Sequence, residues 1–432
     1  MHQSIGNRRA VIVAGRRTPF VKAGTQLASL SAVDLAALNL RQLVAAADLP
    51  LHLLDEVLCG CVLPPTAAPN VAREAILRNG LPRRIPGLTM NRACTSSLQT
   101  AVSAAEMILA GSANAVVAMG VESLSQMPIP YSRSLLDGLQ ALKRADGIPA
   151  KMAALAAIPL GELLPGMPAI AETSTGQSMG QHADRMAQRF GATRQAQDEW
   201  ALISHQRAAA AQTEGRFAGE IHPVWPESGD PAGVTLDTGV RPTTSLAALG
   251  ALKPVFDKAY GTVTAGNASP MTDGAAGLLV MEESFARANG YVPLAAIKSW
   301  STVALDPADE LLIGPALAIP AALRKAGLAW SDIGLTELHE AFAAQVVSTF
   351  AALESAAFAK EYLGAEQAVG TVDRDRVNVD GGSLAIGHPF GATGARLLWH
   401  ATQALHRRDE TFAMVAACAA GGQGMAIVLE RL

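Results

Sequence analysis

The chain has 432 residues, of which half are hydrophobic and 17% are charged. This composition is typical of a folded protein with a large interior, it excludes a disordered chain, and the length favours more than one hydrophobic core. A formal net charge of -4 gives no support for nucleic-acid binding, which requires a basic face.

The amino-terminal segment contains a short apolar run, Ala10 to Ala14, with arginines on both sides. It is too short for the core of a secretory signal and predicts a buried strand. No stretch approaches the roughly 20 apolar residues of a membrane-spanning helix. We therefore expect a soluble, cytoplasmic protein.

Short apolar runs then alternate with Ala-rich helical stretches, which predicts an α/β fold. Towards the amino terminus we expect strands at 56–63 and 113–121 and helices at 32–49, 71–80 and 97–111. The same pattern returns with a strand at 293–302, helices at 315–327 and 391–408, a strand running into a helix at 335–353, and two strands around a Gly-rich turn at 412–432. This return indicates a duplication.

The middle of the chain differs from both ends. We expect 1–122, completed by 251–285, to form one half, 286–432 the other, and 123–250 an inserted helical lid. Within the lid, 131–170 is rich in Leu, Ala and Pro, and two amphipathic helices follow. The first helix is expected to end at Gly191, and Thr193 is a candidate cap of the second.

Cys94 precedes a helical pattern. A cysteine at a helix amino terminus is exposed to the positive end of the dipole, which lowers the thiol pKa and favours the nucleophilic thiolate. The alternative is a small buried cysteine, the commonest role of a free one. Four cysteines in so long a chain do not indicate a disulfide framework.

Three further segments could reach the same site. His388 stands among glycines, which predicts a sharply bent backbone presenting a base. Cys418 ends a strand before a Gly-rich turn whose N–H groups could bind an oxyanion. His339 and Glu340, at a strand-to-helix junction, could orient a water or a carbonyl, or could cap the helix.

The other cysteines and histidines carry weaker signals. Cys59 and Cys61 alternate in a strand without a partner pair for zinc, so we expect them to pack in the core. We expect the remaining histidines to lie on the surface: His52, His182, His205, His222, His400 and His406. The sequence contains neither a P-loop nor a dinucleotide-binding glycine pattern.

Taken together, NRACTSS, HEAFAAQ, GGSLAIGHPFGATGAR and CAAGGQG resemble the thiolase family in order and spacing. The likeness extends to RTPF, AREAILRNGLP and GTVTAGNASPMTDGAA and covers nearly the whole chain. It implies a thiolase fold, α/β, with two similar halves in a five-layer αβαβα arrangement under a lid. It also implies an acyltransferase that acts on 3-ketoacyl-CoA and CoA, with CoA as a substrate and no tightly bound cofactor or metal.

The resemblance assigns roles by position. Cys94 resembles the acyl-accepting nucleophile, His388 its base, and Cys418 the acid/base at the α-carbon of the substrate. His388 and His339 would bind the thioester oxygen, His339 through a water. The N–H groups of Cys94 and Ala420 would form the second oxyanion hole.

Contacts to CoA carry over less completely. Ser269 matches a position at the pantetheine and Arg241 one near the nucleotide end. Ser178 and Ala248 stand where many members have His and Ser, which leaves the nucleotide contacts open.

At two places the sequence differs from many thiolases, and these differences indicate a subfamily. His339 replaces an asparagine found in many thiolases, and Cys418-Ala419-Ala420 replaces Cys-Ile-Gly. With the 131–170 segment, these features resemble the thiolase β-subunit of fatty-acid oxidation complexes. We therefore expect thiolytic cleavage in β-oxidation by a homodimer or dimer of dimers, and a hydratase/dehydrogenase α-subunit as partner. The 131–170 segment could line an acyl tunnel, touch a membrane surface, dock that partner, or simply pack in the lid.

Three alternatives remain at this stage. A biosynthetic acetoacetyl-CoA thiolase uses the same chemistry for condensation. A decarboxylating condensing enzyme would carry histidine in place of Cys418. A non-catalytic lipid carrier would be expected to lose one of Cys94, His388 and Cys418.

Overall fold

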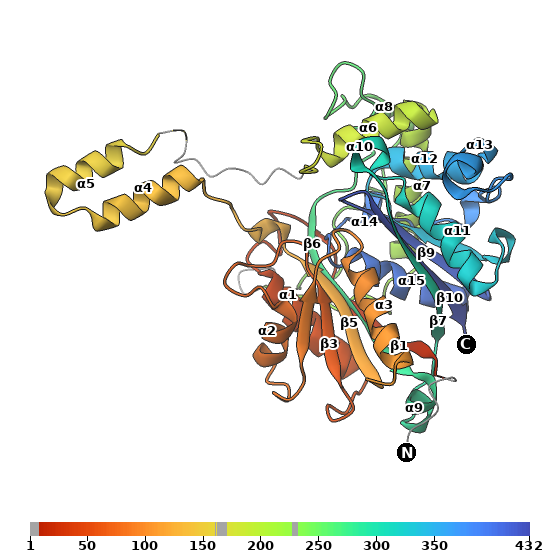
Figure 1. Cartoon of the computed structure of the whole chain (residues 1–432). Coiled ribbons are helices and arrows are strands. Elements are labelled where there is room, and N and C mark those ends of the chain that lie inside the picture. Colours follow the sequence, from red (N-terminus) through yellow and green to blue (C-terminus); the bar gives the residue numbers. More distant parts are fainter. Residues whose placement is uncertain (1–7, 160, 162–170, 227–231) are drawn as a thin grey trace.

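A mixed ten-stranded β-sheet forms the centre of the molecule (Figure 1). The computed structural model describes residues 8–159, 161, 171–226 and 232–432. The strand order is β4-β3-β5-β6-β1-β7-β10-β9-β8, and β2 (Val21–Lys22) pairs with β6. The two halves of the sheet meet at β1 and β7, which pair only through Val11 with Ala296 and Ile12 with Ala295.

The same order of elements occurs twice. The first copy comprises β1 (Ala10–Arg17), α1 (Ala32–Ala46), β3 (Glu56–Gly60), α2 (Val71–Arg78), β4 (Gly87–Met90), α3 (Ser96–Leu109), β5 (Ala115–Glu122) and β6 (Thr272–Glu282). The second comprises β7 (Ala295–Ala304), α11 (Gly314–Ala326), β8 (Leu335–Leu338), α12 (Ala343–Leu353), α15 (Thr393–Arg407), β9 (Phe412–Ala419) and β10 (Gln423–Arg431). In the second copy a single parallel bridge from Thr336 to Val377 stands where β4 pairs with β3 in the first. The duplication predicted from the sequence is confirmed.

The helices and the sheet form five layers. Helices α3 and α15 pack against each other between the two halves of the sheet, α1 and α2 cover the outer face of one half, and α11 and α12 that of the other. Alternate side chains of β5 show this, since Val116 and Ala118 join the central core, whereas Val117 and Met119 join the core under α1 and α2. This is the predicted αβαβα arrangement.

The two central helices approach each other closely because small residues line their contact. A Cβ added at Gly394 of α15 would lie 2.5 Å from the backbone nitrogen of Leu98 in α3. Both helices begin at the segments that the sequence predicts to be functional. Their packing therefore brings these two segments together.

Two helices of the inserted segment pack on the carboxy-terminal half. These are α6 (Met179–Phe190) and α7 (Arg194–Thr213), which both contact α12. The predicted caps are confirmed: Gly191 ends α6 with a left-handed φ of 67°, and the Thr193 side chain accepts a hydrogen bond from the N–H of Ala196. These two caps fix the turn between the helices.

The hairpin formed by α4 (Arg133–Arg144) and α5 (Gly147–Ala156) extends away from the rest of the molecule (Figure 1). Part of the 131–170 segment, residues 160 and 162–170, lies outside the described residues. Within the described ranges, no helix combines the length and the apolar character needed to cross a bilayer.

Short elements complete the fold. The α-helices among them are α8 (Leu246–Gly250), α9 (Glu283–Ala288), α10 (Pro307–Glu310), α13 (Ala356–Phe358) and α14 (Ser383–Ile386). Single turns of other helix types span Leu124–Gln126, Trp330–Asp332, Ala359–Leu363 and Arg374–Arg376.

The expected surface position is wrong for four of the six remaining histidines. His182, His205, His222 and His400 are buried. Three of them lie on the packed faces of α6, α7 and α15, and His222 lies in a loop whose backbone bonds Arg17 of β1. His400 lies in an ionic cluster, with Nδ1 bonded to Glu220 and Nε2 3.0 Å from a carboxylate oxygen of Asp380. His52 and His406 are exposed, as expected.

Candidate active site

Cys94 lies in a tight turn two residues before α3. The preceding residue, Ala93, has a φ of 46°, a left-handed conformation that is strained for a residue with a Cβ. The Ser96 side chain holds the turn, since its Oγ donates to the Ala93 carbonyl at 2.6 Å and accepts from the Arg92 N–H at 2.8 Å. A fixed loop therefore presents the sulfur.

Burial dominates the acidity of this thiol. It raises the pKa of Cys94 to about 12, although the N–H groups of Ala420 and of Cys94 itself bond the sulfur and lower the pKa, while the charge of Glu122 raises it. The expectation that the helix dipole favours a resting thiolate is therefore wrong, because burial has the larger effect. Cys94 rests as a thiol and requires a base during attack. The two N–H groups on its sulfur are those expected to form an oxyanion hole.

Glycines allow the His388 loop to pass close to other backbone, as the sequence predicts. Gly387 has a φ of 112°, and a Cβ at Gly391 would lie 2.5 Å from the carbonyl oxygens of Gly60 and Val121. The His388 N–H donates to the Pro270 carbonyl at 3.2 Å. The loop is thus held between the two halves of the molecule.

The hydrogen bonds of His388 define its tautomer. Thr393 donates its only hydroxyl hydrogen to the Pro389 carbonyl at 3.1 Å, so its Oγ1 can only accept from His388 Nδ1, 2.7 Å away. Nδ1 therefore carries the proton, and Nε2 has a free lone pair. Burial, and then the charge of Arg396, lower the pKa of His388 to about 3, which keeps the imidazole neutral. His388 is a neutral base.

His339 has the opposite arrangement. His339 follows β8 directly, and its backbone N–H donates to the carbonyl of Ala416 in β9. Its ring Nδ1 lies 3.0 Å from Ser383 Oγ. The Arg396 guanidinium, which can only donate, also bonds Ser383 Oγ, at 3.3 Å. Among the described residues, His339 Nδ1 is the one acceptor within reach of the Ser383 hydroxyl hydrogen, so this hydroxyl donates to Nδ1 and the imidazole proton stays on Nε2. Burial, followed by the charges of His388 and Arg396, lowers the pKa of His339 well below its ordinary value.

These three side chains converge. Cys94, His339 and His388 each offer a ligand atom, and the three atoms lie within 4.8 Å of one another. The two ring centroids are 4.1 Å apart, and both Nε2 atoms are buried without a hydrogen-bond partner. Buried polar atoms of a folded protein are rarely left unpaired, so these two nitrogens are candidates to bind a substrate or a water. The site thus combines a thiol, a lone pair and an N–H donor.

Cys418 lies near the end of β9, two residues beyond the carbonyl that binds His339. Burial, followed by the electrostatic interaction with Cys94, raises the pKa of Cys418. The turn that follows is held by the segment before α6, since the Gly421 N–H donates to Glu172 at 2.8 Å. Cys418 is therefore within electrostatic range of Cys94.

Ser269 belongs to a segment that passes between the two histidine loops. Its N–H donates to the Ala341 carbonyl at 3.0 Å, and the next residue, Pro270, accepts from the His388 N–H. Arg241 has an exposed side chain, and its N–H donates to His205 Nδ1 at 3.2 Å. Ser269 thus adjoins the site, whereas Arg241 lies on the surface.

Comparison with known proteins identifies the family. The model of the thiolase amino-terminal domain matches residues 10–284, and that of the thiolase carboxy-terminal domain matches residues 291–431. The chain belongs to the thiolase family.

Relatives along the whole length agree with this assignment. A probable 3-ketoacyl-CoA thiolase of Caenorhabditis elegans is 43% identical, over 97% of this chain and 93% of that protein. A 3-ketoacyl-CoA thiolase of Escherichia coli is 41% identical, over 98% of this chain and 97% of that protein. Human mitochondrial 3-ketoacyl-CoA thiolase in complex with CoA has a TM-score of 0.81 at 31% identity, with 98% of both chains covered. Bacillus anthracis acetyl-CoA acetyltransferase has a TM-score of 0.83 at 32% identity, over 98% of this chain and 99% of that one. The predicted family, fold class and acyltransferase class are confirmed.

Glu340 of this thiolase does not have the water-orienting role that the sequence suggested. Glu340 cannot orient a substrate water, since its two carboxylate oxygens accept from Trp200, Ser204, Asn378 and the Leu384 N–H. It ties lid helix α7 to the loop before α14. Cys59 and Cys61 are buried and free, as expected.

Glu122 was missed by the sequence analysis. It is fully buried and accepts from the N–H groups of Val62, Leu63 and Gly391. Burial raises its pKa to about 7, although these hydrogen bonds lower it. A glutamate at a strand end gives no local signal of these contacts.

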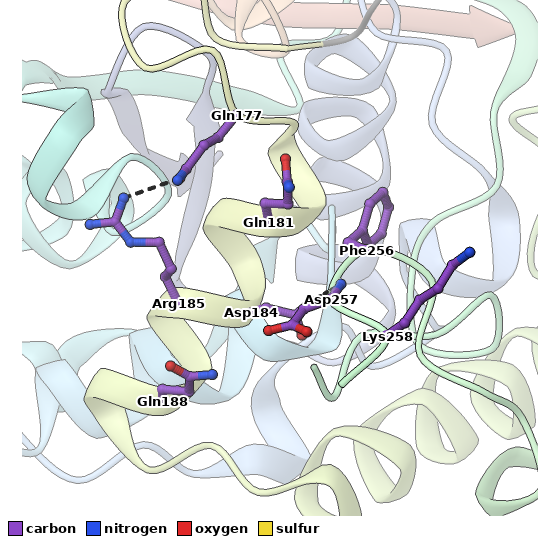
Figure 2. A pocket seen from close by; sticks show the side chains of 8 residues that line it. All are labelled: Gln177, Gln181, Asp184, Arg185, Gln188, Phe256, Asp257 and Lys258. Carbon is purple, nitrogen blue, oxygen red and sulfur yellow. Dashed lines mark hydrogen bonds between the residues drawn. The ribbon is translucent and has the colours of Figure 1, made fainter. Parts of the chain in front are cut away.

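A separate hollow of about 330 Å³ lies beside α6 of this thiolase (Figure 2). Gln177, Gln181 and Arg185, in and just before α6, face it from one side, and Phe256 and Lys258 line the other. Phe256 packs edge-on against Phe342, three residues after His339, with ring centroids 6.1 Å apart. None of the predicted catalytic residues lines the hollow.

Proposed function

We propose that the chain is a 3-ketoacyl-CoA thiolase that cleaves its substrate with CoA, in fatty-acid β-oxidation, to acetyl-CoA and a shortened acyl-CoA. The convergence of Cys94, His339 and His388 within 4.8 Å carries this proposal. The names of the full-length relatives support it.

In the first half-reaction, Cys94 attacks the 3-keto carbon while His388 Nε2 takes the thiol proton. The N–H groups of Cys94 and Ala420 stabilise the resulting oxyanion, each by about 3 kcal/mol in the barrier. The bond between C2 and C3 then breaks and leaves an acyl-Cys94 thioester and the enolate of acetyl-CoA. Cys418 protonates the enolate carbon.

The histidine tautomers suit this step. Once His388 has taken the proton of Cys94, its Nε2–H faces the site beside the Nε2–H of His339. Two donors then stand at the thioester oxygen, where negative charge develops in the enolate. His388 thus acts first as a base and then as a donor.

In the second half-reaction, free CoA takes the acyl group from Cys94. The proton that His388 took from Cys94 first passes to the Cys418 thiolate, which restores both groups. His388 then deprotonates the CoA thiol, which attacks the thioester carbonyl in the same oxyanion hole. The tetrahedral intermediate expels the Cys94 thiolate, which takes the proton back from His388. We assign Ser269 to the pantetheine arm, since its segment passes between the two histidine loops, and Arg241 to the nucleotide end. Residues 123–250 act as the lid over this substrate.

The alternatives are less well supported. The relatives described above carry the name 3-ketoacyl-CoA thiolase, although one structural neighbour is an acetyl-CoA acetyltransferase. A lipid carrier would not need two orphaned imidazole nitrogens beside a thiol. A biosynthetic enzyme would differ in chain-length preference.

The decisive experiment is an assay of CoA-dependent cleavage across 3-ketoacyl-CoA chain lengths, with Cys94→Ala as the paired variant. We expect cleavage of medium and long chains and a near-total loss of activity in the variant. Full activity of Cys94→Ala would refute the mechanism, and cleavage of acetoacetyl-CoA alone would refute the degradative assignment.

We further propose a cytoplasmic homodimer or dimer of dimers in which the α4–α5 hairpin contacts an anionic membrane surface. The hairpin and the residues that lead into it expose large apolar side chains, namely Tyr131, Leu136, Leu139, Ile148, Met152 and Leu155. The hairpin also carries four basic residues, Arg133, Lys143, Arg144 and Lys151. Apolar and basic side chains together favour the headgroup region of an anionic bilayer. Flotation with phosphatidylglycerol vesicles tests this contact. Failure to bind vesicles, with binding to a hydratase/dehydrogenase α-subunit instead, would assign the hairpin to that partner.

A further inference from the structure

The three converging side chains form a set of metal ligands as well as a catalytic site. Their ligand atoms lie within 4.8 Å of one another, a spacing that a small shift of the side chains reduces to that around one ion. His339 and His388 have relative exposures of 0% and 4%, and their Nε2 atoms have no partner. The group thus combines one sulfur with two buried imidazoles, each of which has one unpaired ring nitrogen.

The donor types select the metal. One thiolate and two imidazoles form a set that Zn²⁺ and similar divalent transition metals prefer, and three protein ligands leave a fourth position for water. Hard cations such as Mg²⁺ require oxygen ligands, which this set lacks.

The outer hydrogen bonds also suit a metal. A ligating imidazole is held by a bond from its other nitrogen, and here Thr393 and Ser383 lie 2.7 Å and 3.0 Å from the Nδ1 atoms of His388 and His339. His388 already carries its proton on Nδ1. His339 would move its proton from Nε2 to Nδ1, and the Ser383 hydroxyl would rotate to accept it.

We propose that Cys94, His339 and His388 bind Zn²⁺ or a similar soft divalent metal, which inhibits the enzyme by occupying the nucleophile and the base. On binding, the Cys94 thiol proton leaves to solvent and the sulfur bonds the ion as thiolate. No electron transfer is involved.

His339 makes the site tridentate. With an asparagine in its place, the pocket would keep only one sulfur and one imidazole, because a neutral amide is a poor ligand for zinc. Affinity for Zn²⁺ therefore depends on His339, which is not the base that deprotonates Cys94 in the proposed mechanism.

The test uses purified full-length protein and Co²⁺ as a spectroscopic probe, with Zn²⁺ displacing it. We expect one Co²⁺ per chain, a sulfur-to-cobalt charge-transfer band in the near ultraviolet, and protection of Cys94 from alkylation by iodoacetamide. His339→Asn should weaken binding at least about 10-fold, and Cys94→Ala should abolish the band. Cys418→Ser is the matched control and should bind as the wild type does.

Absence of the charge-transfer band, or equal affinity in His339→Asn, would overturn the proposal. A band that persists in Cys94→Ala and disappears in Cys418→Ser would assign the metal to other ligands and also overturn it. These readouts need no turnover, so their failure is distinct from a failure of the thiolase assignment. In the active enzyme, Zn²⁺ should abolish cleavage, and a chelator should restore it.

Discussion

His339 and His388 hold their protons on opposite ring nitrogens although their ring centroids are only 4.1 Å apart. The difference comes from the two hydroxyls behind them. Thr393 uses its hydrogen on the Pro389 carbonyl and can only accept, whereas Ser383 accepts from Arg396 and has its hydrogen free to donate. The two neighbouring imidazoles thereby differ at Nε2, which carries a lone pair in His388 and an N–H in His339.

Thr393→Val tests the role of the first hydroxyl. Valine has nearly the same shape but cannot accept from His388 Nδ1, so the imidazole loses the bond that fixes its tautomer. We expect kcat to fall by about 10- to 100-fold with little change in KM, since outer-shell bonds of this kind contribute about that much. Thr393→Ser keeps the hydroxyl and should recover most of the activity. Equal kinetic constants in all three proteins would contradict the tautomer assignment.

Ser383→Ala tests the second hydroxyl. Without it His339 Nδ1 has no donor, so the neutral ring no longer keeps its proton on Nε2. We expect kcat to fall by about 10-fold and the ¹⁵N shifts of the His339 ring to move towards the other tautomer. Ser348→Ala removes another buried hydroxyl, one that bonds the Met186 carbonyl, and serves as the control. Unchanged ¹⁵N shifts in Ser383→Ala would refute this role.

The candidate catalytic residues could be predicted from the sequence because they lie in short motifs. Gly387 and Gly391 indicated a bent, closely packed loop, and the structure shows such a loop at His388. Local signals also predicted the turn between α6 and α7, because capping depends on residues a few positions apart. Such features need no knowledge of the rest of the fold.

Other features depend on contacts that no local pattern contains. The pKa of Cys94 was predicted from the helix after it, but burial by distant segments decides its direction. Ser383 is 44 residues from His339, and Glu220 is 180 residues from His400. A histidine in a polar helix looks like a surface residue until the sheet and the lid enclose it.

Gly120→Ala tests the close contact between β5 and the His388 loop. A Cβ at Gly120 would lie 1.9 Å from the Gly391 carbonyl oxygen, so either β5 or the loop must shift. We expect a loss of about 3 kcal/mol in the free energy of unfolding, measured in urea, and a lower kcat. Gly219→Ala is the control, because its Cβ would meet no atom within 4 Å. It should change stability by less than about 0.5 kcal/mol, and an equal effect of both variants would contradict the argument.

The last prediction concerns the buried ionic cluster around His400. Burial lowers the pKa of His400, but the charges of Glu220, Glu337 and Asp380 outweigh it and raise the pKa to about 10. The carboxylates also bond arginines of α15 and of other segments: Arg17 at Glu220, Arg396 at Glu337, and Arg216 and Arg407 at Asp380. His400 is therefore charged in the folded protein at neutral pH.

The direction of the pH effect follows from this shift. Because the folded-state pKa lies above the ordinary value of 6.5, protonated His400 stabilises the fold fully below pH 6.5, and this contribution is lost as the pH rises towards 10. Asp380, whose pKa is lowered to about 2 despite its burial by its bond to His400 and by nearby positive charges, stays ionised throughout that range. We expect His400→Gln to have a lower melting temperature than the wild type at pH 6, with the difference shrinking steadily by pH 10. Calorimetry at matched ionic strength measures it, and a difference that stays constant from pH 6 to pH 10 would show that His400 is neutral in the folded chain.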